Sequence, residues 1–200
     1  MNTDLLLKNI DRHIQLDNEE TDFFISILQA KKLKRKEFLL RPGEICKTEN
    51  FITKGCLRAY TIDENGFEHI LMFGIEDWWI GDLHSLLTRS PATYFVQALE
   101  DAEVIQYTKE NLDTLLVRVP KFERFYRIML QRSLIALHQR VSQSLALSAE
   151  ERYINFIKKY PHLQDRLSQK QIAAYLGITP IFLSMLRKKL APKVETIKLL

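Results

Sequence analysis

The chain has 200 residues, of which 46% are hydrophobic, enough for a buried core in one large domain or two small ones. Its formal net charge of +4 is unevenly distributed, because residues 151–200 carry 10 Lys or Arg against 3 Asp or Glu, a balance of +7, whereas residues 1–150 carry 19 against 22. Two cysteines, Cys46 and Cys56, are too few for a disulfide scaffold or, within one chain, a four-cysteine metal cluster.

The N-terminal residues MNTDLLLKNIDR contain early acidic residues and lack the plan of a signal peptide. No apolar run approaches the length that crosses a membrane. We therefore expect a cytoplasmic protein with no membrane contact. Both cysteines lie in β-like runs, where the expected role is that of small buried hydrophobic side chains.

Residues 4–30 have the spacing of two helices. Apolar residues recur through the first helix, and Asp17 with Glu20 has the arrangement of a capping box for the second. The run KKLKRK at 31–36 contains no aromatic residue, which favours a solvated connector. The second helix is expected to bury Phe23, Phe24, Ile27 and Leu28.

Residues 37–107 consist of short apolar runs separated by turn signals. Five of the six glycines fall between Gly43 and Gly81. The runs FLL, FIT, CLRAYTI, HILMF, YFVQAL and EVIQY are bounded by PG, KG, ENG and SP. This density of short strands and turns is typical of an antiparallel sandwich or barrel.

A long helical pattern without internal Gly or Pro runs from Pro120 to Leu145. Phe122, Phe125 and Met129 form one apolar face of it. A second apolar stripe recurs along the same helix at spacings of four and three. It is consistent with a coiled-coil-like homodimer seam and also with a helix wholly buried within one chain. The residues of this stripe are Tyr126, Leu130, Leu134, Leu137, Val141 and Leu145.

The sequence SAEE at 148–151 has the spacing of a capping box and opens a helix that ends before Pro161. No flexible linker precedes it, which favours coupled domains. We therefore predict an α+β chain in three parts. They are an N-terminal β-rich domain at 1–119, the long helix at 120–147 and a C-terminal helical domain at 148–200.

The run SQKQIAAYLGITPIFLSMLRKKL near the C-terminus predicts two short helices joined by a tight turn. Ser168 with Gln171 has capping-box spacing, and Gly177 can adopt the positive φ that ends a helix. Thr179 is a good N-cap for the second helix, with Pro180 at its first position. With an apolar seam between the helices, this is a helix-turn-helix pattern.

The outer side of the second predicted helix is left free and carries positive charge towards its end, where the helix dipole also favours cations. This charge on the basic end of the chain favours a polyanion as the ligand; an ordinary helical hairpin in a core is the alternative. The residues predicted to contact double-stranded DNA are Ser168, Gln169, Thr179, Pro180, Ile181, Ser184, Met185, Arg187, Lys188 and Lys189.

Several segments together resemble a known family. FLLRPGEICKTENFITKGCLRAY, IGDLHSLL and ALEDAEV resemble the cyclic-nucleotide-binding β-roll, and a helix-turn-helix follows at the C-terminus. From about residue 20 to 190 the chain resembles the Crp/Fnr family of bacterial transcription regulators. The resemblance implies an antiparallel β-roll, a long dimerisation helix and a winged-helix-like DNA-binding domain. It also favours the homodimer seam as the role of the apolar stripe.

The resemblance further implies a candidate effector pocket. In cyclic-AMP-binding relatives, a Gly-Glu pair holds the ribose and an Arg-Ser/Thr pair holds the cyclic phosphate. The matching pairs here are Gly81-Asp82 and Ala92-Thr93, so the arginine is missing, and Arg89 lies on the wrong side of Pro91. Because a buried phosphate without a positive partner carries a large desolvation penalty, we expect no cyclic AMP binding. The candidate effector pocket comprises Gly81, Asp82, Leu83, Ala92, Thr93 and Tyr94.

Other effector chemistries have weaker support in the sequence. His69 and His84 are conceivable haem or metal ligands, but two lone histidines more often serve structural roles. Trp78, Trp79 and Tyr94 could line an apolar pocket, although aromatic residues beside a β-roll more often belong to its core. We therefore expect no metal and no cofactor.

Together these features predict a homodimeric, sequence-specific transcription regulator. Its expected partners are double-stranded DNA, RNA polymerase and an unidentified small-molecule effector, if the protein has one. The alternative is a small-molecule sensor or scaffold that acts through protein contacts and has a vestigial helix-turn-helix. Ile181 and Met185 support this alternative, because relatives usually carry polar or charged readers there. No nucleophile–base pair, P-loop or metal-ligand spacing supports an enzyme.

Overall fold

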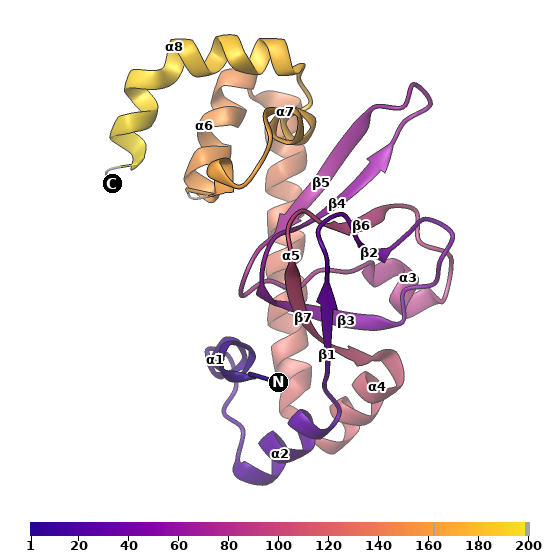
Figure 1. The fold of residues 1–200 in the computed structure, drawn as a ribbon. Helices are drawn as coiled ribbons and strands as arrows, with labels where there is room; N and C mark the ends of the chain where they lie inside the picture. Colours follow the sequence, from indigo (N-terminus) through magenta and orange to yellow (C-terminus); the bar gives the residue numbers. More distant parts are fainter. Residues whose placement is uncertain (162, 199–200) are drawn as a thin grey trace. The chain divides into compact units, whose positions relative to one another are not determined.

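The computed structural model describes residues 1–161 and 163–198, with side chains as far as Leu190 (Figure 1). The chain divides into two compact units. The first comprises residues 1–61 and 71–132, and the second comprises residues 62–70 and 133–200. The division falls within the long helix expected at 120–147, so that helix contributes residues to both units.

Seven strands of the described chain form two sheets, of strand order β1-β7-β3 and β2-β6-β4-β5. Pairing is antiparallel between β7 and its two neighbours and between β6 and its two neighbours. Ile52 and Val104 of the first sheet pack in one core with Leu57 and Val96 of the second, which confirms the expected antiparallel β-roll. The strands are β1 Gln29–Leu33, β2 Phe38–Leu40, β3 Thr48–Lys54, β4 Leu57–Ile62, β5 Glu68–Gly74, β6 Phe95–Ala98 and β7 Ala102–Thr108.

Three of the helices around the roll begin at a capping side chain. The predicted capping box of Asp17 and Glu20 is confirmed, since each side chain accepts a hydrogen bond of 2.9 Å from the other residue's backbone N–H. The side chains of Asp82 and Thr108 cap two further helices. The helices are α1 Asp4–Asp11, α2 Asn18–Ser26, α3 Leu83–Thr88, α4 Lys109–Arg118 and α5 Lys121–Ala146.

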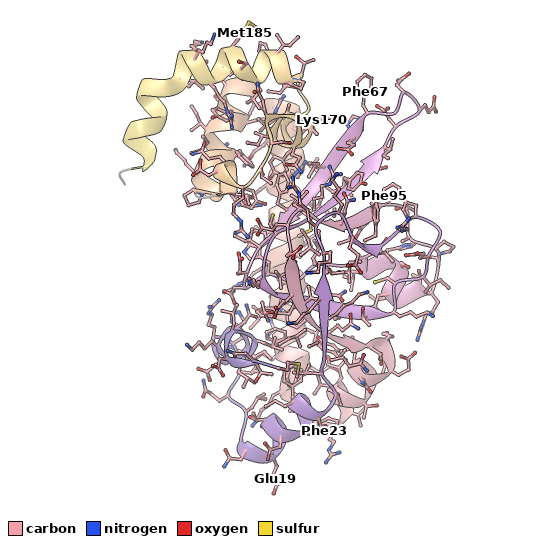
Figure 2. All side chains as sticks on the ribbon, in the orientation of Figure 1. Glu19, Phe23, Phe67, Phe95, Lys170 and Met185 are labelled. Atoms are coloured by element: carbon pink, nitrogen blue, oxygen red, sulfur yellow. The ribbon has the colours of Figure 1, made fainter. Side chains whose placement is uncertain are left out.

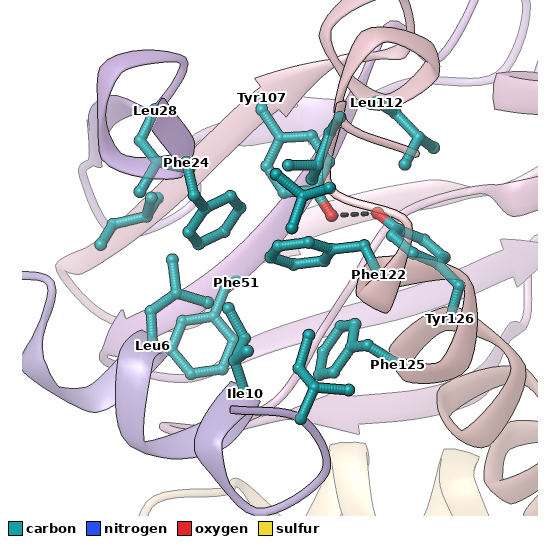
Figure 3. Close-up of a cluster of buried hydrophobic side chains, with 14 residues drawn as sticks. Leu6, Ile10, Phe24, Leu28, Phe51, Tyr107, Leu112, Phe122, Phe125 and Tyr126 are labelled. Atoms are coloured by element: carbon teal, nitrogen blue, oxygen red, sulfur yellow. Dashed lines mark hydrogen bonds between the residues drawn. The ribbon is translucent and has the colours of Figure 1, made fainter. Parts of the chain in front are cut away.

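The first sheet also has an outward face, which helices cover. Phe51 of β3 and Ile105 of β7 lie opposite each other and point away from the interior of the roll, because side chains alternate along a strand. Both pack in an aromatic cluster with side chains of α1, α2, α4 and α5 (Figure 3). The residues labelled in that figure are Leu6, Ile10, Phe24, Leu28, Phe51, Tyr107, Leu112, Phe122, Phe125 and Tyr126.

The prediction of a solvated connector at 31–36 is wrong for its first half. β1 pairs residue by residue with β7, so that Lys31 lies opposite Val104 and Lys32 opposite Glu103. β1 is an edge strand, and charged side chains are common at sheet edges because they discourage pairing with another chain. The lysines are therefore compatible with a strand and mark its exposed edge.

α5 has two contrasting faces. Phe122 and Phe125 are buried in the aromatic cluster, as the sequence predicts for one face. Tyr126, which the sequence assigns to the second apolar stripe, is also buried at 8% exposure, and its hydroxyl is hydrogen-bonded to that of Tyr107 in β7. Tyr126 therefore belongs to the core, because the roll and its helices still surround this part of α5. The other members of the stripe, Leu130, Leu134, Leu137, Val141 and Leu145, are exposed.

The second unit is helical apart from residues 62–70. α6, Ala149–Lys159, begins at the predicted capping box of Ser148 and Glu151. A short 3-10 helix, η1 Leu163–Asp165, precedes α7 Gln169–Leu176 and α8 Pro180–Lys198. In the described residues no strand follows β7, so the strands of a wing are not seen there and α8 continues as a helix. None of the helices described is long and apolar enough to cross a membrane.

Candidate nucleic-acid interface

α7 and α8 begin with the caps that the sequence predicts. The Ser168 hydroxyl accepts a hydrogen bond from the Gln171 N–H at 3.3 Å, and the Gln171 side-chain oxygen accepts one from the Ser168 N–H at 2.7 Å. The Thr179 hydroxyl accepts a hydrogen bond from the Phe182 N–H at 3.2 Å, and Pro180 is the first residue of α8. Both predicted helix starts are therefore confirmed.

A glycine in the left-handed conformation joins the two helices. Gly177 has φ 65° and ψ 39°, a region that glycine adopts without a steric cost. Immediately after it, the Ile178 N–H donates to the Ala173 carbonyl at 3.1 Å. This hydrogen bond satisfies a carbonyl at the end of α7 and closes the turn.

One side of α7 and one side of α8 are buried together. Ile172 and Leu176 of α7 are at most 5% exposed, and the leucines of α8 are at most 7% exposed. α6 and its end contribute aromatic rings, of which Phe156 and Tyr160 are in contact with Tyr175 of α7. The buried leucines, which determine the side of α8 that remains outside, are Leu183, Leu186 and Leu190.

The opposite side of α8 is exposed. Successive residues of a helix are turned by about 100°, which places four residues opposite the buried leucines; we call them the outer face of α8. Ile181 is 75% exposed, Met185 is 56% exposed and Lys188 is exposed, whereas Ser184 is half-buried. Figure 2 shows Met185 on the side of α8 that points away from α6 and α7. The outer face of α8 is therefore apolar at Ile181 and Met185 and positively charged at Lys188.

Two other residues predicted to contact DNA have polar contacts within the protein, and a third is half-buried. Gln169 donates from Nε2 to the Pro180 carbonyl at 2.6 Å, so this amide joins α7 to α8. The Lys189 ammonium lies 2.7 Å from the Glu150 carboxylate of α6. Arg187 is half-buried on the flank of α8. These contacts leave Lys188 as the exposed cation on the outer face of α8.

The first residue pair of the candidate effector pocket has structural roles in the β-roll. Asp82 is 3% exposed, and its carboxylate caps α3 by accepting a hydrogen bond of 3.0 Å from the Ser85 N–H. The Gly81 carbonyl accepts a hydrogen bond of 2.8 Å from the Tyr94 hydroxyl. Burial, followed by the nearby Asp82 charge, raises the pKa of the Tyr94 phenol above its ordinary value.

The second pair provides no positive charge. Ala92 is 4% exposed, its N–H donates to the Glu44 carbonyl at 2.8 Å, and its carbonyl accepts from the Gly43 N–H at 2.9 Å. The Arg89 guanidinium forms an ion pair with the Glu110 carboxylate of α4, and this hydrogen-bonded pairing lowers the pKa of Glu110 to about 2. Arg89 therefore already has an anionic partner.

A hollow of about 530 Å³ opens in the first unit beside these residues. Of the candidate effector pocket it contains only Gly81, whereas Leu83 and Thr93 are exposed elsewhere on the surface. The predicted pocket is thus only partly assembled. The residues that line the hollow are Lys31, Leu39, Leu40, Glu44, Ile45, Cys46, Lys47, Thr48, Asn50, Gly81 and Gln106.

The histidines considered as ligands each have a neighbouring polar group. His69 Nε2 lies 2.8 Å from an Asp63 carboxylate oxygen, and His84 Nδ1 lies 3.4 Å from the Ser90 hydroxyl. Cys46 and Cys56 are both buried, which confirms the expected hydrophobic role, and burial raises the pKa of the Cys46 thiol. Within the described part of the chain, no three His, Cys, Asp or Glu side chains are grouped to hold a metal ion.

Known proteins resemble this chain both in the β-roll segment and over most of its length. The sequence model of the cyclic nucleotide-binding domain family matches residues 30–118. The anaerobic regulatory protein of Haemophilus influenzae is 26% identical over 176 residues, covering 82% of this chain and 68% of that protein. The structure of FixK2 from Bradyrhizobium japonicum has a TM-score of 0.73 at 16% identity and covers 84% of this chain and 86% of that one. The structure of a Crp/Fnr family regulator from Eubacterium rectale has a TM-score of 0.70 at 12% identity, and the match covers 92% of this chain and 95% of that one.

The chain is similar to Crp/Fnr-type regulators in sequence and in fold. Its resemblance in sequence motifs is thereby confirmed, and so is the fold of β-roll, long helix and C-terminal helix-turn-helix. The chain spans about two-thirds of the length of the Haemophilus relative. Its departures from the cyclic-AMP-binding pattern, at Asp82 and Ala92, lie within the segment that the domain model matches.

The sequence did not predict one residue that supports the helix-turn-helix. Arg140 of α5 donates from Nη2 to the Tyr175 carbonyl of α7 at 3.2 Å and to the Ile70 carbonyl of β5. Its guanidinium also lies 4.0 Å from the centre of the Tyr175 ring. Nothing in the local pattern of α5 indicates this contact, because its partners are far away in the sequence. Lys170 of α7 and Phe182 of α8 are also exposed, and the sequence did not predict either of them to contact DNA.

Proposed function

We propose that this protein is a homodimeric, sequence-specific DNA-binding regulator of transcription of the Crp/Fnr type. The observation that carries the proposal is a capped helix-turn-helix whose second helix keeps one side, the outer face of α8, outside its own core. A recognition helix in a major groove needs such a free side. The +7 balance of residues 151–200 places this helix on the basic part of the chain, which suits contact with phosphates.

The side chains of α7 and α8 divide into two classes on DNA. Lys188 is a long exposed cation suited to phosphate contacts. Lys189 can add a contact when it leaves Glu150, and the half-buried Arg187 can add one when its side chain extends from the flank of α8. Residues at the starts of the two helices position the backbone, where helix N-termini favour phosphate groups. These are Ser168, Gln169, Thr179 and Pro180. The remaining residues of the outer face of α8 turn towards base edges.

The dimer contact of the proposal is the exposed stripe of α5. Four of its residues alternate at spacings of four, three and four, as the a and d positions of a coiled coil do. They are between 39% and 56% exposed in the single chain, and Leu145, one turn further, is 84% exposed. A row of exposed apolar side chains is a surface that a partner typically covers. The four residues are Leu130, Leu134, Leu137 and Val141.

A symmetric dimer has a geometric consequence for the operator. Two α8 helices in successive turns of one major groove require half-site centres about 34 Å apart, arranged as an inverted repeat. The β-roll is the sensor in this proposal, and its effector is a small molecule other than cyclic AMP, if one is used. RNA polymerase is the proposed target of the DNA-bound dimer.

A second candidate function has one observation in its favour. Ile181, Phe182 and Met185 are between 40% and 75% exposed on α8, and exposed apolar residues of this kind also suit a protein partner. In that case the chain is a sensor or scaffold whose helix-turn-helix does not read DNA.

The experiment that separates the two functions mixes the purified full chain with a library of genomic fragments and sequences those that are retained. The proposal predicts retained fragments that share an inverted repeat of the stated spacing. Lys188→Glu is the matched variant, because it reverses one exposed charge on the outer face of α8. If the original chain and Lys188→Glu retain the same unselective set of fragments, the DNA-binding function is rejected and the scaffold is favoured.

A further inference from the structure

The outer face of α8 has an unusual chemistry for a surface that reads DNA. Its first two turns contain Ile181, Ser184 and Met185, and its single cation, Lys188, comes last. Ile181 and Met185 are the most exposed of the large apolar residues described in α8. Figure 2 shows Met185 extended away from the rest of the second unit, where a groove of DNA would lie in the proposed function.

Among the described residues, the first two turns of this face lack the charged and amide side chains that usually read hydrogen-bonding base edges, and its one lysine, Lys188, lies beyond them. Arginine and lysine read guanine, asparagine and glutamine read adenine, and acidic residues read cytosine. The nearby amide of Gln169 is committed to the Pro180 carbonyl at 2.6 Å, and the ammonium of Lys189 to Glu150 at 2.7 Å. Arg187 is half-buried on the flank. The outer face therefore has one short hydroxyl, Ser184, between two apolar side chains.

The major groove presents one apolar group, the C5-methyl group of thymine, and apolar side chains read DNA by packing on it. We infer that this protein recognises its operator half-site mainly through thymine methyl groups contacted by Ile181 and Met185. Ser184 adds a hydrogen bond that several base edges can accept or donate. The inference rests on the proposed DNA-binding function and specifies the kind of site it reads: half-sites with thymines at the positions beneath the first two turns of α8.

The energetic scale of this reading is modest for each contact. Burying one methyl group contributes about 0.8 kcal/mol, which corresponds to about a fourfold change in affinity. Two such contacts in each half-site of a symmetric dimer would together change the affinity by about two orders of magnitude. The remaining affinity comes from phosphate contacts, which do not depend on sequence.

Replacing thymine by uracil tests the inference directly, because this substitution removes the methyl group and leaves the base-pair hydrogen bonds unchanged. The operator is first selected from a random library with the full chain. Duplexes with deoxyuridine at one thymine pair at a time are then titrated in a fixed salt concentration. We expect about a fourfold loss of affinity at the read positions and no change at the others. Duplexes with cytosine at those positions should bind the protein weakly. Methylation of that cytosine at C5 should restore part of the affinity.

Two variants connect the effect to the outer face of α8. Met185→Ala should remove the uracil effect at one position of each half-site and keep it at the position read by Ile181. Lys188→Ala should weaken binding to thymine and uracil duplexes by the same factor.

The outcomes separate the inference from the function on which it rests. If selection yields no preferred sequence, the proposed DNA-binding function fails. If a preferred sequence emerges and uracil replacement changes its affinity by less than twofold at every position, DNA binding stands and the reading through methyl groups is overturned.

Discussion

At the scale of single residues, Glu49 is an acidic group placed in the aromatic cluster. It lies opposite Tyr107 in the β3–β7 pair and is 8% exposed, and its Oε1 has no hydrogen-bond partner among the described residues. Burial raises the pKa of this carboxyl from the ordinary 4.5 to about 7. The folded chain therefore binds more protons than the unfolded chain between these two pH values.

Because the folded-state pKa is raised, the free energy of unfolding should decrease as the pH rises from about 4.5 to about 7 and should level off above that. Glu49→Gln removes the titration, and we expect the variant to be more stable than the original chain at pH 8, by an amount on the order of 3 kcal/mol, and similar at pH 4.5. Urea unfolding at several pH values measures this. Glu103→Gln, at a half-buried residue of β7 whose carboxylate lies 3.5 Å from the Lys32 ammonium, is the control. A pH dependence that is the same with and without Glu49 would contradict the prediction.

Also at the residue scale, the sensor should not bind cyclic AMP. Ala92 is buried where relatives that bind the nucleotide have an arginine, and Arg89 is paired with Glu110. A cyclic phosphate would lose its hydration and gain no guanidinium partner. Titration calorimetry should detect no binding at micromolar cyclic AMP, and affinity in that range would refute the prediction. If the calorimeter detected heat of cyclic AMP binding, the disappearance of that heat in the Arg89→Ala variant would show that Arg89 leaves Glu110 to bind the phosphate.

At the scale of elements, α5 is predicted to hold two chains together through its exposed stripe. Leu137→Glu would bury an unpaired charge in the two-fold contact, which costs about 3–5 kcal/mol. Sedimentation should then show a monomer with weak DNA binding and an unchanged helical spectrum. Val117→Glu, at an 82% exposed residue of α4, should remain a dimer. A Leu137→Glu variant that stays a tight dimer would place the seam elsewhere.

At the scale of the whole molecule, the positive charge is concentrated in the last fifty residues. Lys188→Ala should therefore weaken binding to all sequences by nearly the same factor and reduce the salt slope of the affinity by about one. Titrations of two unrelated operators at two salt concentrations measure both quantities. Lys32→Ala, which removes an exposed lysine from β1, should leave the slope unchanged. A Lys188→Ala variant that reorders the preferred operators would instead assign this lysine to base reading.

The sequence alone determined the parts of this protein that depend on neighbours along the chain. The capping boxes at Asp17, Ser148 and Ser168 and the left-handed Gly177 are all where the sequence predicts them. Each depends on hydrogen bonds or backbone sterics within a few residues, so the local sequence contains the whole cause. The same holds for the burial of one side of α8, which follows from helical spacing.

Only the tertiary structure decided the contacts between residues far apart in the sequence. β1 is a strand because β7 supplies its hydrogen-bond partners, whereas its lysines indicated a solvated connector. Tyr126 fits the spacing of the exposed stripe, yet its hydroxyl meets that of Tyr107 in the core. Arg140 holds Tyr175 across 35 residues of sequence. Such contacts depend on which surfaces the fold brings together, and the periodicity of one helix or strand does not encode that information.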